Sequence, residues 1–176
     1  MLPNFLESID PDDNYFNNFF ACTDQNIQSD YFSVDKLNGV FNGNNNQNFF
    51  LVNCNIQSFQ AKYDALMCTL QSLDYAPSIL ILTETWLDSN KALCANIDAY
   101  TAFHVTRPTA IGGGVSIFVC SDISARKLDD ISFSNITIEI LTVELRLNDY
   151  IFNIVALYRP HSDSIDNFND IFLNYI

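Results

Sequence analysis

A single carboxylate, Glu84, stands where an apolar run gives way to polar residues. Residues 79–82 are all aliphatic and follow Pro77, a pattern typical of a strand buried on both faces. The chain then continues Thr83-Glu84-Thr85-Trp86. In open α/β sheets ligands bind beyond the carboxyl ends of the strands, so an acid at this place could hold a metal ion. From this stretch alone, a polar exit from the strand is the favoured interpretation, and the rest of the chain changes that balance.

Asn55 is expected to lie near Glu84. Residues 49–54 form an earlier apolar run, which predicts a strand, and residues 58–73 carry apolar side chains at helical spacing. A strand, a helix and a second strand form a right-handed crossover with parallel strands. The first strand ends at Asn53-Cys54-Asn55, so both strand ends lie at the same edge and Asn55 can face Glu84 across it.

Tyr158 ends a further expected strand. Residues 138–147 and 150–158 are two strands separated by Asn148-Asp149, a two-residue hairpin turn signal. Pro160 cannot continue a ladder of backbone hydrogen bonds, so Tyr158 marks a strand end. Because each directly follows an apolar strand, we expect Asn55, Glu84 and Tyr158 to converge at one edge of a single sheet.

Three more elements complete the expected body. Residues 99–105 are a short extended segment, and residues 115–119 form a strand after Gly112-Gly113-Gly114. A glycine run can cradle phosphate, but neither a helix start nor a lysine follows as in a P-loop, so a turn is favoured. Residues 165–175 carry apolar side chains at roughly helical spacing and predict a helix, capped by Ser162 or Asp163.

Residues 1–48 differ in composition from residues 49–176. They are rich in Asn and Asp with scattered Phe and Tyr, and no period of 3.6 or 2 persists. Residues 42–48 are polar and of low complexity, as in a linker. We therefore expect residues 1–48 to be a mostly irregular, acidic and Asn-rich leader, whose aromatic residues dock on the main body or on another chain. Residues 49–176 would form one domain.

The composition indicates a globular chain and argues against several functions. Of the 176 residues 48% are hydrophobic, which suffices for one sizeable core. The net charge of −13, with only eight Lys and Arg, is a poor footprint for a nucleic-acid binder. Five scattered cysteines without Cys-x-x-Cys spacing suggest neither zinc nor disulfides. Without a signal-peptide pattern or a membrane-length apolar run, we expect an intracellular protein, nuclear or cytoplasmic and not secreted.

Four motifs occur in an order and spacing that resemble one family. They are residues 55–66, residues 82–87 with Thr83-Glu84-Thr85-Trp86, residues 112–119, and Tyr158-Arg159-Pro160. Residues 49–176 resemble the amino-terminal half of the endonuclease domain of non-LTR (LINE-like) retrotransposon reverse transcriptase proteins, part of the endonuclease/exonuclease/phosphatase superfamily. The resemblance implies an α/β fold, a partial four-layer α/β sandwich, of which this chain would supply about one sheet plus its helices.

The resemblance also implies a site for Mg²⁺ or Mn²⁺. In the family an Asn at the end of the first strand and the Glu of the Thr-Glu-Thr-Trp motif hold the metal, and the Tyr before Arg-Pro contacts the scissile phosphate. Those positions are Asn55, Glu84 and Tyr158, the expected catalytic residues. Asn53 is a rival to Asn55, because the Asn-Cys-Asn register is ambiguous by two residues. The chain departs from the family at Gln57, where Arg, Asn or Asp is frequent.

The family completes its site with segments that this sequence does not contain. They are a Gly-Asp-Phe-Asn segment and a Ser-Asp-His segment whose His is the general base. His104, expected on a loop, and His161 lack these contexts and are expected to be ordinary surface or boundary residues. We therefore expect a truncated fragment of a magnesium-dependent DNA endonuclease, one that nicks target DNA for retrotransposon integration but is inactive alone. Expected partners are DNA, in the complete domain, and the missing half or another protein chain. Two alternatives stay open: a phosphatase of the same superfamily, and a non-enzymatic acidic fragment that binds protein.

Overall fold

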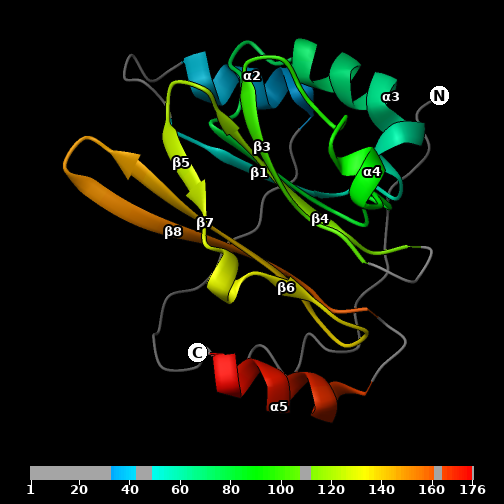
Figure 1. Cartoon of the computed structure of the whole chain (residues 1–176). Helices are drawn as coiled ribbons and strands as arrows, with labels where there is room; N and C mark the ends of the chain where they lie inside the picture. The colour runs from blue at the N-terminus through cyan, green and yellow to red at the C-terminus, as the bar shows by residue number, and fades with distance from the viewer. Residues whose placement is uncertain (1–32, 43–48, 108–111, 161–163, 176) are drawn as a thin grey trace, which may run out of the picture. The chain divides into compact units, whose positions relative to one another are not determined.

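The computed structural model describes residues 33–42, 49–107, 112–160 and 164–175, which belong to one compact unit, Ser33–Ile176 (Figure 1). Most of the expected leader, both expected helix caps Ser162 and Asp163, and His161 lie outside the described residues. None of the helices in these ranges is long and apolar enough to span a bilayer.

The first sheet has four strands in the order β1-β2-β4-β3. Their bounds are Leu51–Asn55 for β1, Ile79–Thr83 for β2, Val115–Cys120 for β4 and Tyr100–Val105 for β3. β1 and β2 are parallel, as expected, and Asn55 lies opposite Thr83. β2 is an inner strand with residues fully buried on both faces, which explains why its sequence shows no polar alternation.

The second sheet is built on the expected hairpin, β7 (Glu139–Leu147) and β8 (Tyr150–Tyr158). Two short strands, β5 (Ser124–Lys127) and β6 (Phe133–Ser134), pair with the other edge of β7. The expectation of about one sheet is therefore wrong, because the chain supplies four strands to each of two sheets. β5 and β6 are too short to be recognised in the sequence. Without them only the two hairpin strands were expected here, so a second sheet was not predicted.

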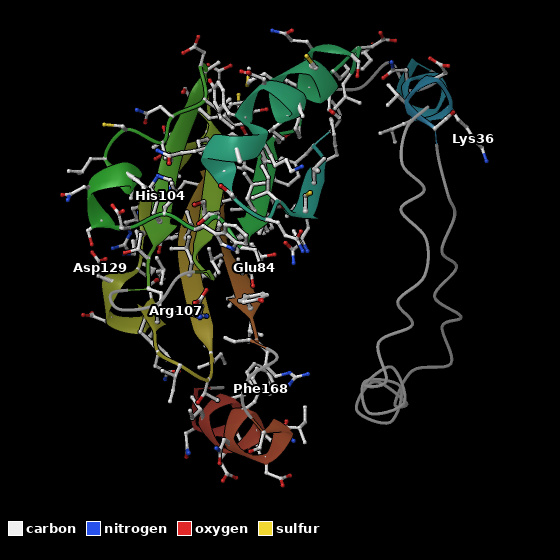
Figure 2. All side chains as sticks on the ribbon, turned by 90° about the vertical axis from the view of Figure 1, so that its right-hand side faces the viewer. Lys36, Glu84, His104, Arg107, Asp129 and Phe168 are labelled. Carbon is white, nitrogen blue, oxygen red and sulfur yellow. The ribbon has the colours of Figure 1, made fainter. Side chains whose placement is uncertain are left out.

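Helices cover the outer face of the first sheet, and a further helix packs at one end of the second sheet (Figures 1 and 2). α3 (Phe59–Gln71), capped by Ser58, and the short α4 (Ser89–Ala92) lie over the first sheet, where Phe59 stacks on Phe118. α5 (Ile165–Tyr175) packs Phe168 against the second sheet. This helix–sheet–sheet–helix order confirms the partial four-layer sandwich.

The leader is not wholly irregular, since α2 (Val34–Asn42) is a helix within it. The Asn38 side chain donates to the carbonyl of Ser72 at 3.0 Å and accepts from the amide of Asp74 at 3.1 Å. α2 is therefore tied to the carboxyl end of α3 by polar contacts, which a search for hydrophobic periodicity does not detect.

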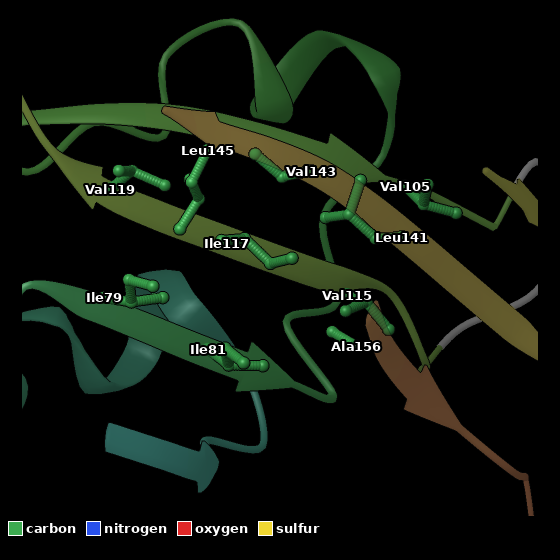
Figure 3. Close-up of a cluster of buried hydrophobic side chains, with 10 residues drawn as sticks. All are labelled: Ile79, Ile81, Val105, Val115, Ile117, Val119, Leu141, Val143, Leu145 and Ala156. Carbon is green, nitrogen blue, oxygen red and sulfur yellow. The ribbon is translucent and has the colours of Figure 1, made fainter. Parts of the chain in front are cut away.

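The core lies between the two sheets (Figure 3). Alternate residues of the facing strands point into it, so each sheet buries one face there. The buried side chains are Ile79, Ile81, Val105, Val115, Ile117, Val119, Leu141, Val143, Leu145 and Ala156. Burying each large aliphatic side chain contributes about 1.5–3 kcal/mol, so this face-to-face packing sets the relative position of the two sheets and of the residues at their ends.

Candidate active site

Glu84 lies directly after β2 in an unusual backbone conformation. Its φ is 55°, in the left-handed region that residues other than glycine rarely adopt. Of the six such residues in the described ranges, four lie in two adjoining loops: Gln57 and Ser58 after β1, and Glu84 and Trp86 after β2. The Ser58 amide donates to the Glu84 carbonyl at 2.9 Å, which joins the two loops. Local strain of this kind gathers at functional sites.

Three donors converge on the Glu84 carboxylate. Trp86 Nε1 donates to Oε2 at 2.5 Å, the Gly113 amide donates to Oε2 at 2.9 Å, and the Tyr158 hydroxyl donates to Oε1. Partial burial raises the pKa of Glu84, but these hydrogen bonds and the nearby charge of Arg107 outweigh it and hold the pKa below its ordinary value. Glu84 is therefore ionised at neutral pH.

Tyr158 reaches Glu84 from the other sheet. It is the last residue of β8, so the expectation that all three residues share a single sheet is wrong. The sheets pack face to face, and their strand ends meet at the same end of the sandwich, which brings the phenol onto the carboxylate. Burial and the bond to Glu84 raise the pKa of Tyr158, so it is a neutral donor.

Asn55 lies at the same sheet edge as Glu84. It pairs with Thr83, the residue before Glu84, and its side chain is exposed. Asn53 pairs with Ile81 and lies about 7 Å farther back along β1. Of the two rivals, Asn55 is thus level with the end of β2. The hydrogen bonds of the Glu84 carboxylate come from Trp86, Gly113 and Tyr158 and not from the Asn55 side chain.

A buried ion pair beside this site was not foreseen. Glu139 is fully buried, and Arg107 Nε donates to its Oε1 at 2.7 Å while Nη2 makes a charge contact at 2.5 Å. Burial raises the pKa of Glu139, and Arg107 partly offsets it. The sequence did contain a signal for a buried acid. Glu139 lies on the same face of the strand as Leu141, Val143 and Leu145, because alternate residues of a strand share a face, so its side chain points into the core.

The glycine run is a turn, as expected, and its amides bind protein carboxylates. Gly113 donates to Glu84, and Gly114 donates to Glu139 at 2.6 Å. The carbonyls of the same two glycines accept from Trp86 at 2.8 Å and Thr85 at 3.1 Å. Both glycines have positive φ and leave no room for a Cβ, which explains why no other residue fits there.

The remaining candidates add no metal ligands. His104 lies in β3 rather than on a loop, with Nδ1 2.7 Å from Ser116 Oγ, and burial lowers its pKa to about 4. Within the described ranges, no group of three or more His, Cys, Asp or Glu side chains is placed to hold a metal. A metal site here depends on Glu84 and Asn55.

No protein-family model and no curated protein sequence matches the chain. Solved structures do match it. The endonuclease domain of TRAS1, a telomere-specific non-LTR retrotransposon, superposes with a TM-score of 0.52 at 14% identity, over 73% of this chain and 54% of that domain. The AP endonuclease LMAP of Leishmania major superposes with a TM-score of 0.53 at 14% identity, over 72% of this chain and 47% of that enzyme.

These likenesses agree with the arrangement of two packed sheets between helices. They are too distant in sequence to carry residue roles or substrates. The chain spans about half the length of either structure. It has the endonuclease/exonuclease/phosphatase fold and contains about half of it.

Proposed function

We propose that this chain carries one half of the active site of a metal-dependent DNA endonuclease of the non-LTR retrotransposon kind. The complete domain would hydrolyse one phosphodiester of a target duplex and leave a 3′ hydroxyl. Glu84 and Asn55 would hold Mg²⁺ or Mn²⁺, and Tyr158 would bind the scissile phosphate.

The observation that carries the proposal is the contact between Tyr158 and Glu84. Two polar groups from different sheets meet at the strand ends, where ligands bind in α/β folds. One is an ionised carboxylate and the other a neutral phenol, and the strained loops after β1 and β2 lie beside the carboxylate. A purely structural strand exit does not require such an arrangement.

The donor set at this edge fits a hard divalent cation. Mg²⁺ prefers oxygen ligands and keeps several waters, so one carboxylate and one amide are an adequate protein share. Among the residues that the structure describes, Glu84 Oε1 accepts a hydrogen bond only from the Tyr158 hydroxyl, so it has lone-pair capacity left for a cation. When bound, the metal would polarise the phosphoryl oxygen and stabilise the leaving alkoxide.

Tyr158 is suited to phosphate binding as a donor. Its raised pKa keeps the proton on the phenol, so the hydroxyl can donate but cannot act as an anionic nucleophile near neutral pH. In this structure the hydroxyl donates its hydrogen bond to Glu84. A bound phosphate would compete with Glu84 for the hydroxyl, and a donor at this position stabilises charge that develops on the phosphate oxygens.

The charge distribution limits how this half can contact DNA. Five of the eight cationic side chains form ion pairs with acidic residues of the same chain. They are Lys91, Arg107, Arg126, Lys127 and Arg146. Backbone phosphates need unpaired cations, so we infer that the complete domain draws most of its DNA affinity from other segments.

The test is magnesium-dependent nicking of supercoiled plasmid by a domain in which this chain is joined to the remaining half of the fold. Glu84→Gln should lower the rate at least about 100-fold, because the metal loses its charged ligand. Glu144→Gln makes the same charge change on β7, where the carboxylate pairs with the exposed Arg126 far from Glu84, and should leave the rate unchanged. Wild-type nicking by the Glu84 variant would overturn the proposal. Hydrolysis of phosphoinositides but not of plasmid would favour the phosphatase branch instead.

A further inference from the structure

We propose that the buried Arg107–Glu139 ion pair is a positioning device for Glu84. It would act through the glycine turn, by holding the Gly114 amide while the neighbouring amide of Gly113 holds Glu84. This inference rests on the proposed function only in taking Glu84 as the reactive carboxylate.

The first support is that the two carboxylates bind consecutive amides. Gly113 N lies 2.9 Å from Glu84 Oε2, and Gly114 N lies 2.6 Å from Glu139 Oε2. The two peptide planes share the Cα of Gly113, so the bond from Gly114 to Glu139 fixes one side of the peptide that holds Glu84. The backbone after Glu84 is fixed to the same turn by the bonds from Thr85 and Trp86 to the glycine carbonyls.

The second support is the register of the hairpin. Glu139 lies directly opposite Tyr158 in the β7–β8 pairing. The same residue therefore neighbours both groups that approach Glu84 from outside its own loop, namely the glycine turn and the Tyr158 phenol. No other charged side chain of β7 is in that position, because Glu144 and Arg146 lie toward the hairpin turn.

The third support is energetic. A buried ion pair is weak evidence for stability, since an apolar pair of similar volume is often as stable or more so. Arg107 is 13% exposed and Glu139 fully buried, so both charges are desolvated at a cost. A positional role explains why this costly arrangement lies against the glycine turn and not elsewhere in the core.

Trp86 gives a local signal for the test. It is the only tryptophan of the chain, and its Nε1 donates to Glu84. A ¹H–¹⁵N spectrum of the metal-free protein therefore contains one indole resonance, whose position reports the hydrogen bond to the carboxylate. The spectrum of Glu84→Gln gives the chemical shift of the indole when Trp86 has lost the carboxylate as its hydrogen-bond acceptor.

We expect Glu139→Gln to move the indole resonance toward that of the Glu84 variant and to broaden it, whereas Glu144→Gln leaves it at the wild-type position. Apparent Mn²⁺ affinity, from quenching of Trp86 fluorescence, should fall about 10-fold or more in Glu139→Gln but stay at the wild-type value in Glu144→Gln. If Glu139→Gln does not fold, the double variant Arg107→Met with Glu139→Leu replaces the charges by apolar volume and should fold while still moving the resonance.

An unmoved resonance in Glu139→Gln, or in the double variant, would overturn the positioning role. So would an equal shift in Glu144→Gln, which would indicate a general loss of stability. The proposed function fails separately: wild-type protein would then give no Glu84-dependent response to Mn²⁺, although the indole shifts could still follow the expected pattern.

Discussion

The hydroxyl of Tyr158 donates a hydrogen bond to the carboxylate of Glu84 across the two sheets of the sandwich, although 74 positions separate the two residues in the chain. Tyr158 is the last residue of β8 and Glu84 directly follows β2, and the apolar faces of the two sheets behind them pack together. The contact is thus a consequence of sheet packing, and it should respond to changes in either partner.

Removing the Tyr158 hydroxyl should weaken both function and stability. Tyr158→Phe keeps the ring in the core but deprives Glu84 of one donor, so the free energy of unfolding should fall by about 1–2 kcal/mol. In the complete domain, nicking should fall about 100-fold. Urea denaturation and plasmid nicking measure the two effects.

Tyr150→Phe is the matched control, because Tyr150 begins the same strand and is 68% exposed. It should change neither quantity. Equal losses in the two variants would contradict a specific role for Tyr158.

Acid should weaken the fold through His104. Its pKa lies near 6.5 in the unfolded chain and at about 4 in the folded chain, so between these values the unfolded state binds more protons. Stability is therefore lost as pH falls from about 6.5 to about 4, by up to about 3 kcal/mol from this residue. The cause is burial beside Phe118 and Ser116, which disfavours the imidazolium.

The measurement is the urea midpoint between pH 7 and pH 4 for wild type and for His104→Gln. Carboxylates contribute equally to both chains, so the difference isolates His104. The variant should lose less stability over this range. Parallel curves would show that His104 does not titrate as described.

The glycine turn should not tolerate a side chain. A Cβ at Gly114 would lie 2.5 Å from Thr85 Oγ1, and the φ of +87° is strained for any other residue. Gly114→Ala should therefore cost about 2–4 kcal/mol. Gly39→Ala, in the interior of α2 with nothing within 4 Å, should instead stabilise by about 0.5–1 kcal/mol. Thermal unfolding of both variants checks the contrast, and a harmless Gly114→Ala would contradict the close packing of the turn.

Much of the fold could be predicted from the sequence, for identifiable reasons. The runs 79–82 and 115–119, the helix from Ser58 and the hairpin at Asn148-Asp149 all carry strong local signals. β5 and β6 carry weak ones, because four and two residues are too few to show a period. Because β5 and β6 were not predicted, the second sheet was not predicted either.

The arrangement of the candidate site could be predicted only where local sequence patterns determine it. Asn55 ends β1 and Glu84 follows β2, and a local crossover joins these strands, so their common edge could be predicted from the sequence. The sheet that carries Tyr158, and the pairing of Arg107 with Glu139, depend on contacts between distant segments that no local pattern specifies. The inward register of Glu139 was the one available signal.

Residues 1–176 in isolation should self-associate. β8 pairs only with β7 among the described strands, and Tyr150, Ile151 and Phe152 on it are exposed. Free edges with apolar side chains invite pairing with other chains, despite the net charge of −13. Sedimentation velocity should show concentration-dependent association that Ile151→Lys reduces. A monomer at all concentrations would contradict this.

The central claim, that the carboxylate of Glu84 is a ligand for a divalent metal, can be tested on this chain directly by Mn²⁺ quenching of its single tryptophan. Trp86 is hydrogen-bonded to Glu84, so a paramagnetic ion at that carboxylate must quench it. Mn²⁺ also binds diffusely to an acidic protein, and Glu144→Gln, with the same charge as Glu84→Gln, corrects for this. We predict saturable quenching in wild type and in Glu144→Gln, weakened at least about 10-fold in Glu84→Gln. Equal quenching curves for the two variants would contradict the account.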